Sequence, residues 1–293
     1  MMKKITRVLG SLALACSLVT GSALAEEVAS ETKKPPLEST TGIKSSGFEN
    51  NNVNALLWLQ KSAEARALFY QAFNLGDMIL DKALADKSYK KKPAVVVDID
   101  ETILENGPYL ALLALEGTDD YPFWDEWTDV ADAAATPGSV EFLNGVAKKG
   151  VDIFYVSNRY LENVPGTLKN LKKLGFPQVE ESHLLFMDRN GSSTKEPRRQ
   201  KVSQTHDIVL LMGDNLIDLS QAFEMPTSEE RNKKVDELKD QFGKRLVILP
   251  NPTYGFWLDH LQEGYGKMNA EQKRKARLHA LEYWKTDLLK VSR

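Results

Sequence analysis

The stretch AVVVDIDETILENGPY, residues Ala94 to Tyr109, joins an unbroken apolar run directly to a group of carboxylates. A run such as Ala94–Val97 is typical of a strand that is buried on both faces of a parallel sheet. It is followed at once by Asp98, Asp100 and Glu101. Ligands bind at the carboxyl ends of the strands in open parallel sheets, so this pattern predicts a functional site after Val97.

Two further apolar runs, residues 153–156 and 208–212, also stop abruptly in short polar residues. The polar residues that follow them are Ser157, Asn158, Arg159, Gly213, Asp214 and Asn215, with Asp218 close behind. If the three strands are neighbours, their carboxyl ends meet at one edge of the sheet. The sequence therefore predicts that these side chains converge on one site.

Predicted strands alternate with predicted helices along the rest of the chain. Two helices are expected over 53–85, and others over 137–150, 163–175, 193–205, 228–243 and 269–290, with further strands over 183–187 and 245–252. This alternation predicts an α/β fold with a mostly parallel sheet covered by helices on both faces.

Length, composition and charge limit the classes of function. The chain has 293 residues, of which 42% are hydrophobic and 27% charged, which suits one large globular domain or two small ones. A net charge of −3 gives no electrostatic argument for binding a nucleic-acid polymer. An anionic substrate would have to be bound by local charges, a metal ion or backbone N–H groups.

The N-terminal segment has the pattern of an export signal. Residues 1–25 combine a basic start, an apolar segment too short to span a bilayer and small residues that end at Ala25, which predicts a cleaved signal peptide. Alternatively, Cys16 lies in LALAC, which resembles a bacterial lipobox and would then carry a lipid anchor. The expected location is the periplasm, or the outer membrane and cell surface if Cys16 is lipidated. Residues 26–50 are predicted to be a disordered linker.

The carboxylates at the strand ends predict a metal site. Asp98, Asp100 and Asp214 at one edge would repel one another unless a cation lay between them, and oxygen ligands suit Mg²⁺. Zinc is less suitable, since the four histidines are scattered and the chain has one cysteine. A lone D-x-D also occurs as a simple helix cap, and an EF-hand loop is ruled out by Thr102 and Ile103 at its fixed positions. A D-x-D glycosyltransferase would leave the other two strand ends unexplained.

The motifs DIDET, VSNR, STK and GDN, in this order, resemble the four motifs of the haloacid dehalogenase-like phosphatases. The longer segments DIDETILENGPY, TPGSVEF, GDNLIDL and LPNPTYGFW are similar to those of the class C acid phosphatases within that superfamily. The similarity covers nearly the whole chain from about residue 54. It implies a Rossmann-like α/β domain over 51–293, with a smaller, mainly helical cap formed by the N-terminal helices and by insertions.

The resemblance also implies a role for each motif residue. Asp98 would be the nucleophile that forms an aspartyl-phosphate, Asp100 the general acid, and Lys195 the cation that balances the charge of the nucleophile and of the phosphoryl group. Mg²⁺ would be held by Asp98, by the backbone carbonyl of Asp100 and by Asp214, with Asp218 supporting the waters of the metal ion. The implied reaction is hydrolysis of phosphomonoesters.

Further motif residues would bind the phosphate. These are Ser157, where relatives frequently have threonine, Asn158 and Arg159. The lysine assignment is open, because Arg198, Arg199 and Lys201 lie close to Lys195 in the sequence. Within the first motif, Glu101 is expected to turn away from the phosphoryl site, and Thr102 to fix the turn.

Aromatic residues cluster in an insertion, YPFWDEWTD, and in NPTYGFW near the C-terminus. In the resembled family, residues matching these segments stack on the base of a 5′-nucleotide, so Tyr254 with Trp124 or Trp127 is predicted to bind the substrate. Small phosphomonoesters such as nucleoside monophosphates are the implied partners, and the resemblance leaves a homodimer open. The alternatives are a non-catalytic surface lipoprotein that binds haem or mediates adhesion, and a phosphotransferase on the same fold.

Overall fold

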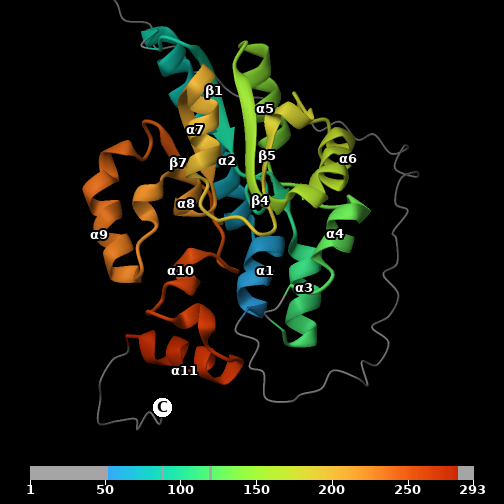
Figure 1. Cartoon of the computed structure of the whole chain (residues 1–293), viewed down its shortest axis with the longest axis vertical. Coiled ribbons are helices and arrows are strands. Elements are labelled where there is room, and N and C mark those ends of the chain that lie inside the picture. Colours follow the sequence, from blue (N-terminus) through green and yellow to red (C-terminus); the bar gives the residue numbers. More distant parts are fainter. Residues whose placement is uncertain (1–51, 88, 119–120, 283–293) are drawn as a thin grey trace, which may run out of the picture. The chain divides into compact units, whose positions relative to one another are not determined.

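The computed structural model describes residues 52–87, 89–118 and 121–282 (Figure 1). These residues belong to one compact unit, residues 44–293. The predicted signal peptide with Cys16, the predicted linker and the end of the predicted C-terminal helix lie outside the described residues. Among the described helices, none is long and apolar enough to cross a membrane.

A parallel sheet of five strands forms the centre of the described unit, in the order β5-β4-β1-β6-β7. The strands are β1 (Lys92–Val97), β4 (Asp152–Tyr160), β5 (Leu184–Met187), β6 (His206–Gly213) and β7 (Leu246–Ile248). The apolar run of the opening stretch is the central strand β1, with β4 on one side and β6 on the other. The predicted α/β fold and parallel sheet are confirmed, and the three polar strand ends come from adjacent strands.

Alternate residues of β1 point to opposite faces of the sheet, and each face is covered by helices (Figure 1). Val95 and Val97 pack into one core cluster, whereas Ala94 and Val96 pack into another. The first face is covered by α2 (Ala63–Asp86), α5 (Ser139–Lys148) and α6 (Val164–Leu174), and the second by α7 (Glu196–Thr205), α8 (Leu216–Leu219) and α9 (Ser228–Leu238).

A smaller group of elements forms a separate apolar cluster at the carboxyl edge of the sheet. It contains α1 (Val53–Lys61), α3 (Gly107–Glu116) and α4 (Trp124–Val130), and nearby lie the ribbon β2 (Leu104–Glu105)–β3 (Ala134–Ala135), α10 (Phe256–Asp259) and α11 (Ala270–Ala280). Leu56 of α1 packs there against Tyr109 and Leu110 of α3. Of the two N-terminal helices expected in the cap, only α1 has this position. The longer helix α2 instead buries its apolar face against the sheet, because Phe69 and Phe73 belong to the main core.

Strand β4 is irregular at its carboxyl end. The segment DIFYVSNR, residues 152–159, was predicted as a strand, and β4 runs through its polar residues Ser157, Asn158 and Arg159 to Tyr160. Its pairing with β5 shifts register between Val156 and Tyr160. The polar side chains therefore lie on an irregular strand end, where a shift of this kind changes the direction of individual side chains.

Candidate active site

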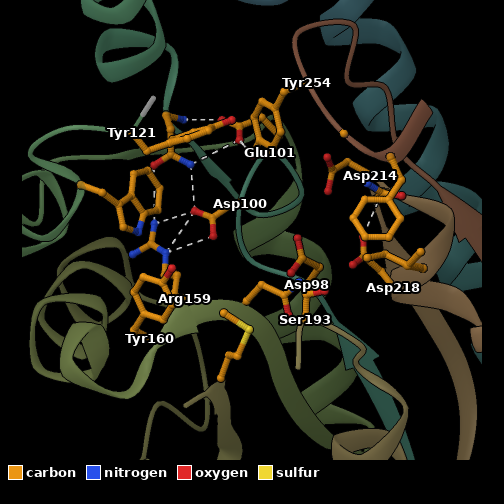
Figure 2. Close-up of a pocket in the computed structure, with 18 of the residues that line it drawn as sticks. Asp98, Asp100, Glu101, Tyr121, Arg159, Tyr160, Ser193, Asp214, Asp218 and Tyr254 are labelled. Atoms are coloured by element: carbon orange, nitrogen blue, oxygen red, sulfur yellow. Dashed lines mark hydrogen bonds and ion pairs between the residues drawn. The ribbon is translucent and has the colours of Figure 1, made fainter. Parts of the chain in front are cut away.

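A cavity of about 550 Å³ lies at the carboxyl edge of the sheet, and residues from all three polar strand ends line it (Figure 2). The predicted residues that line it are Asp98, Asp100, Trp124, Asn158, Arg159, Lys195, Asp214, Asp218 and Tyr254. The structure therefore brings together in one cavity side chains that are more than 150 residues apart in the sequence, such as Asp98 and Tyr254. Ser157 is fully buried just behind the cavity and contacts it through Asp100.

A tight turn after β1 separates the two aspartates. The carbonyl of Ile99 accepts hydrogen bonds from the N–H groups of Ile103 and Leu104, both at 2.9 Å, and the Ile99 side chain is fully buried in the core. Glu101 completes the turn in the left-handed region, with φ 52°. Because Ile99 points into the core, as predicted, its neighbours Asp98 and Asp100 are both directed to the cavity.

Thr102 joins the ends of β1 and β6. Its hydroxyl accepts a hydrogen bond from the N–H of Asp214 at 3.0 Å and lies 3.2 Å from Oδ1 of the same residue. Its carbonyl accepts a hydrogen bond from the Thr136 hydroxyl at 2.7 Å. Thr102 thus holds the turn against the neighbouring strand, in the role expected of it.

Three carboxylates form a group with the geometry of a metal site. One oxygen each of Asp98, Asp214 and Asp218 lie within 4.8 Å of one another. Asp218 reaches the group because its Oδ2 accepts the N–H of Asn215 at 2.9 Å at the start of α8. Gly213 is required beside it, since a Cβ there would come within 2.4 Å of the Asp218 Cβ.

Burial disfavours the ionised forms of two of the three carboxyl groups. It raises the pKa of Asp98 to about 7, against the attraction of Lys195 and with the help of the Asp218 charge. Burial, together with the charges of Asp218 and Asp98, also raises the pKa of Asp214 well above its usual value. A hard divalent cation would favour the ionised carboxylates, so the donor set fits such an ion.

Lys195, at the start of α7, is the lysine in direct contact with Asp98. Its ammonium group donates a hydrogen bond to Oδ1 of Asp98 and lies 2.6 Å from Oδ1 of Asp218. The side chain is almost fully buried, which by itself lowers its pKa, but the two carboxylates outweigh burial and raise it. Lys195 therefore carries a charge in the middle of the acidic group.

The other basic residues of the segment have different partners. Arg198 donates hydrogen bonds to the Ser157 carbonyl and, at 2.6 Å, to Oδ1 of Asn158, so it holds the irregular end of β4. Arg199 donates to the carbonyl of Ile217 at 2.7 Å, and Lys201 is exposed. The structure thus singles out Lys195 among the four basic candidates for the contact with Asp98.

Asp100 points away from the three-carboxylate group and forms an ion pair with Arg159 (Figure 2). Nε and Nη2 of Arg159 donate to Oδ1 of Asp100 at 3.0 and 2.8 Å, and the guanidinium lies 5.5 Å from the ring centre of Trp124. Burial would raise the pKa of Asp100, but the Arg159 charge and hydrogen bonds from Arg159 and Asn106 outweigh it and lower the pKa. The guanidinium of Arg159, expected to bind phosphate, is therefore engaged by Asp100.

Aromatic side chains form another part of the cavity lining. Trp124 of α4, Tyr121 and Tyr254 all line the cavity, and the rings of Tyr121 and Tyr254 are 6.4 Å apart at 80°. The structure does not place Trp127, the predicted alternative to Trp124, at the cavity. Trp127 lies outside the cavity lining, packs into the core, and its indole N–H donates to Asn106 at 2.8 Å.

Glu101 and Asn106 are residues of the cavity wall that the sequence reasoning did not assign. Glu101 points away from Asp98, as expected, but it lines the cavity, is fully buried, and accepts hydrogen bonds from the Tyr254 hydroxyl and the N–H of Asn106. Burial and the neighbouring Asp100 raise the pKa of Glu101 to about 8. The only signal in the sequence was the place of Asn106 directly before Gly-Pro, where a helix begins.

Comparisons with known proteins identify the family and the fold. The family described as HAD superfamily, subfamily IIIB (acid phosphatase), matches residues 16–257. The class C acid phosphatase from Bacillus anthracis is 42% identical, with a TM-score of 0.76 over 81% of this chain and 99% of that one. A second structure of the Bacillus anthracis class C acid phosphatase, with tungstate bound, is 41% identical, with a TM-score of 0.75 over 80% and 98% of the two chains.

Two plant proteins are more distant relatives. The stem 31 kDa glycoprotein of Glycine max is 32% identical over 168 residues, 54% of this chain and 58% of that protein. Acid phosphatase 1 of Solanum lycopersicum is 31% identical over 165 residues, 54% and 57% of the two chains. The chain spans less than two thirds of the length of these curated relatives.

Proposed function

Since the chain belongs to subfamily IIIB of the HAD superfamily, a family of acid phosphatases, we propose that it hydrolyses phosphomonoesters. The observation that carries the proposal is the buried Asp98 at the end of the central strand, in contact with Lys195 and within the three-carboxylate group. The tungstate bound to the Bacillus anthracis relative supports it, because tungstate is an oxyanion with the tetrahedral shape of phosphate.

In the proposed reaction, a carboxylate oxygen of Asp98 attacks phosphorus, and the ester P–O bond breaks as the Asp98–phosphorus bond forms. Asp100 gives its proton to the departing oxygen. In the second half, Asp100 takes a proton from water, the water oxygen bonds to phosphorus, and the bond to Asp98 breaks to release phosphate. The first half needs the protonated form of Asp100, which the Arg159 ion pair makes the minor form by lowering the pKa, and the second half needs the ionised form that the ion pair favours.

We propose Mg²⁺ as the cation of the three-carboxylate group. Asp98, Asp214 and Asp218 would hold it, together with the backbone carbonyl of Asp100. When bound, the ion would neutralise these carboxylates and the phosphoryl oxygens. The support comes from the donors, which are all oxygens, and from the raised pKa of Asp98 and Asp214 without a cation.

Removing divalent cations from the protein should lower its turnover of p-nitrophenyl phosphate by at least about tenfold, and Mg²⁺ should restore it. The reason is that the cation keeps Asp98 ionised and offsets the charge of the incoming phosphate. Colorimetric assays before and after EDTA dialysis measure this, and the unfolding temperature should rise when Mg²⁺ is added back. Full activity after exhaustive chelation would contradict the metal proposal. No activity on any phosphomonoester would favour the non-catalytic surface-binding alternative.

The aromatic part of the cavity supports a finer proposal, that 5′-nucleoside monophosphates are substrates. Tyr254 and Trp124 line the same cavity as Asp98 and Asp100, so the group attached to the phosphate could contact them. Every nucleobase has a π-face that stacks on such rings with little regard to sequence. The support is the position of these rings in the cavity of Asp98, together with the resemblance described from the sequence.

Replacing Tyr254 with alanine should raise the KM for AMP by roughly 5- to 150-fold, which corresponds to the 1–3 kcal/mol of one stacked base. The KM for glycerol phosphate, which has no ring, should change much less. Steady-state kinetics on both substrates measure the difference. Tyr70→Ala, a partly exposed tyrosine of α2 outside this cavity, is the matched control. Equal losses on the two substrates would contradict a stacking role for Tyr254.

A further inference from the structure

Asn106 lies at the start of α3 in the wall of the active-site cavity and is 1% exposed. Its side-chain amide nitrogen donates to Oδ1 of Asp100 at 2.8 Å and lies 3.4 Å from Oε2 of Glu101. Its amide oxygen accepts the indole N–H of Trp127 at 2.8 Å and lies 3.5 Å from Nη2 of Arg159. The side chain thus contacts four functional neighbours at once.

These partners fix the orientation of the amide. The Asp100 carboxylate, which its ion pair with Arg159 favours in the ionised form, has only acceptor atoms, whereas the indole and the guanidinium have only donors. Turning the amide over would place its oxygen against Asp100 and its NH₂ group against the indole N–H of Trp127. The main-chain N–H of Asn106 adds a 2.7 Å bond to Oε1 of Glu101, so the backbone is held as well.

The hydrogen bonds to Asp100 come from several directions. Its Oδ1 receives the amide of Asn106 and the guanidinium of Arg159, and its Oδ2 is 3.3 Å from the Ser157 hydroxyl. Arg159 supplies charge to the carboxyl group, whereas Asn106 supplies a neutral donor whose direction is set by α4 through Trp127. The orientation of Asp100 is therefore coupled to the helix that carries the aromatic wall.

We propose that Asn106 is a positioning residue that aims the Asp100 carboxyl group at the oxygen of the leaving group and links this aim to α4 through Trp127. The inference rests on the proposed phosphatase function, in which Asp100 is the proton donor. A leaving group that departs as a stable anion needs little protonation, whereas a basic leaving group needs a well-placed acid. Loss of Asn106 should therefore harm esters with basic leaving groups most.

The test uses p-nitrophenyl, phenyl and p-methoxyphenyl phosphates, which differ in leaving-group basicity but little in shape. For Asn106→Ala, kcat/KM should fall by no more than about threefold for the nitrophenyl ester. For the methoxyphenyl ester the loss should be roughly tenfold larger, which is a part of the 10²–10⁴ that acid–base catalysis contributes. Asp100→Asn, which removes the acid itself, should show the strongest dependence of kcat/KM on the basicity of the leaving group. Asn144→Ala removes an amide that donates to the carbonyls of Val140 and Gly175 and does not line the cavity, so it should leave the dependence unchanged.

Trp127→Phe is the second variant, because it removes the indole donor and keeps an aromatic ring, so it tests the link even if Asn106→Ala does not fold. It should make kcat/KM depend more steeply on leaving-group basicity, as Asn106→Ala does, but to a smaller extent. Equal losses on all three esters in a folded Asn106→Ala would overturn the positioning role, and an unchanged dependence in Trp127→Phe would overturn the link to α4. The proposed function fails in a different way, namely if the wild-type protein hydrolyses none of the esters.

Discussion

Replacing Asp98 with asparagine should lower kcat on every phosphomonoester by at least about a thousandfold, because the amide cannot act as the attacking nucleophile. Asparagine has nearly the same shape, so the turn after β1 and the packing of Ile99 should survive. Lys195 keeps Asp218 as an ionic partner at 2.6 Å. The loss should therefore be a loss of chemistry in a folded protein.

The stability of the same variant gives an independent check with a defined sign. A carboxyl group whose folded-state pKa is raised, as burial raises that of Asp98 to about 7, destabilises the fold once the pH exceeds its unfolded-state pKa. Removing its charge should therefore leave the free energy of unfolding at pH 8, in EDTA, equal to or above that of the wild type. Urea unfolding measures this. Asp132→Asn, an exposed aspartate paired with Lys173, is the matched control and should retain full activity.

A variant that keeps more than a tenth of wild-type kcat would contradict the role of Asp98 as nucleophile. A variant that loses activity together with its cooperative unfolding transition would point to a structural role instead. Phosphoryl transfer to the protein offers a direct readout, since acid-quenched wild type should carry labelled phosphate from the substrate and Asp98→Asn should carry none.

The central strand and its carboxylates were predictable because their signals are local. An unbroken apolar run such as Ala94–Val97 predicts a strand that is buried on both faces. The alternation of side chains along a strand then predicts that Ile99 points into the core. The parallel direction of the strands beside β1 was also predictable, because alternating helices and strands favour a parallel sheet. The same logic predicts that Asp98, Asp100 and Asp214 lie at one edge of the sheet, and the structure has them there.

The partners of the charged residues were less predictable, since they depend on contacts between distant segments. Four basic residues between 195 and 201 are equivalent in the sequence, and only the start of α7 beside Asp98 distinguishes Lys195. The sequence predicts that Arg159 binds phosphate, but it does not predict the contact of its guanidinium with Asp100, 59 positions away, at the irregular end of β4. A side-chain type can be read from a sequence, whereas its direction at an irregular strand end cannot.

The cavity wall shows a similar limit. Trp124 and Trp127 are one helical turn apart on α4, so either could face the cavity, and packing against the core decides for Trp124. Glu101 is fully buried, and its hydrogen-bond partners Tyr254 and Asn106 carry no positive charge, an arrangement that sequence rules disfavour. It is tolerated because Tyr254 and Asn106 satisfy its oxygens, and both partners are supplied by tertiary structure.

Replacing Lys195 with methionine should lower kcat by roughly a hundredfold to a thousandfold, on the scale of removing one preorganised group that stabilises developing charge. The side chain would keep its volume but lose the ammonium that contacts Asp98 and Asp218. Without divalent cations the variant should also lose about 3–5 kcal/mol of unfolding free energy, the usual cost of leaving buried charges without a partner. Added Mg²⁺ should reduce this loss, since it would supply positive charge to the same carboxylates.

Urea unfolding with and without Mg²⁺ measures the stability change, and assays on p-nitrophenyl phosphate measure the activity. Lys201→Met, an exposed lysine on the same helix, is the matched control and should be nearly neutral in both. A loss of stability that is the same with and without Mg²⁺ would show that Lys195 acts through packing and not through charge.

The double variant Asp98→Asn/Lys195→Met separates the charge balance from catalysis. Asp98→Asn removes a carboxylate that burial penalises, so in EDTA it should recover part of the stability that Lys195→Met loses. Its activity should stay as low as that of Asp98→Asn alone, because the nucleophile is absent. Stability that recovers without activity would show that Lys195 balances the buried carboxylates. If the stability changes of the two single variants simply add up in the double variant, the two side chains act independently.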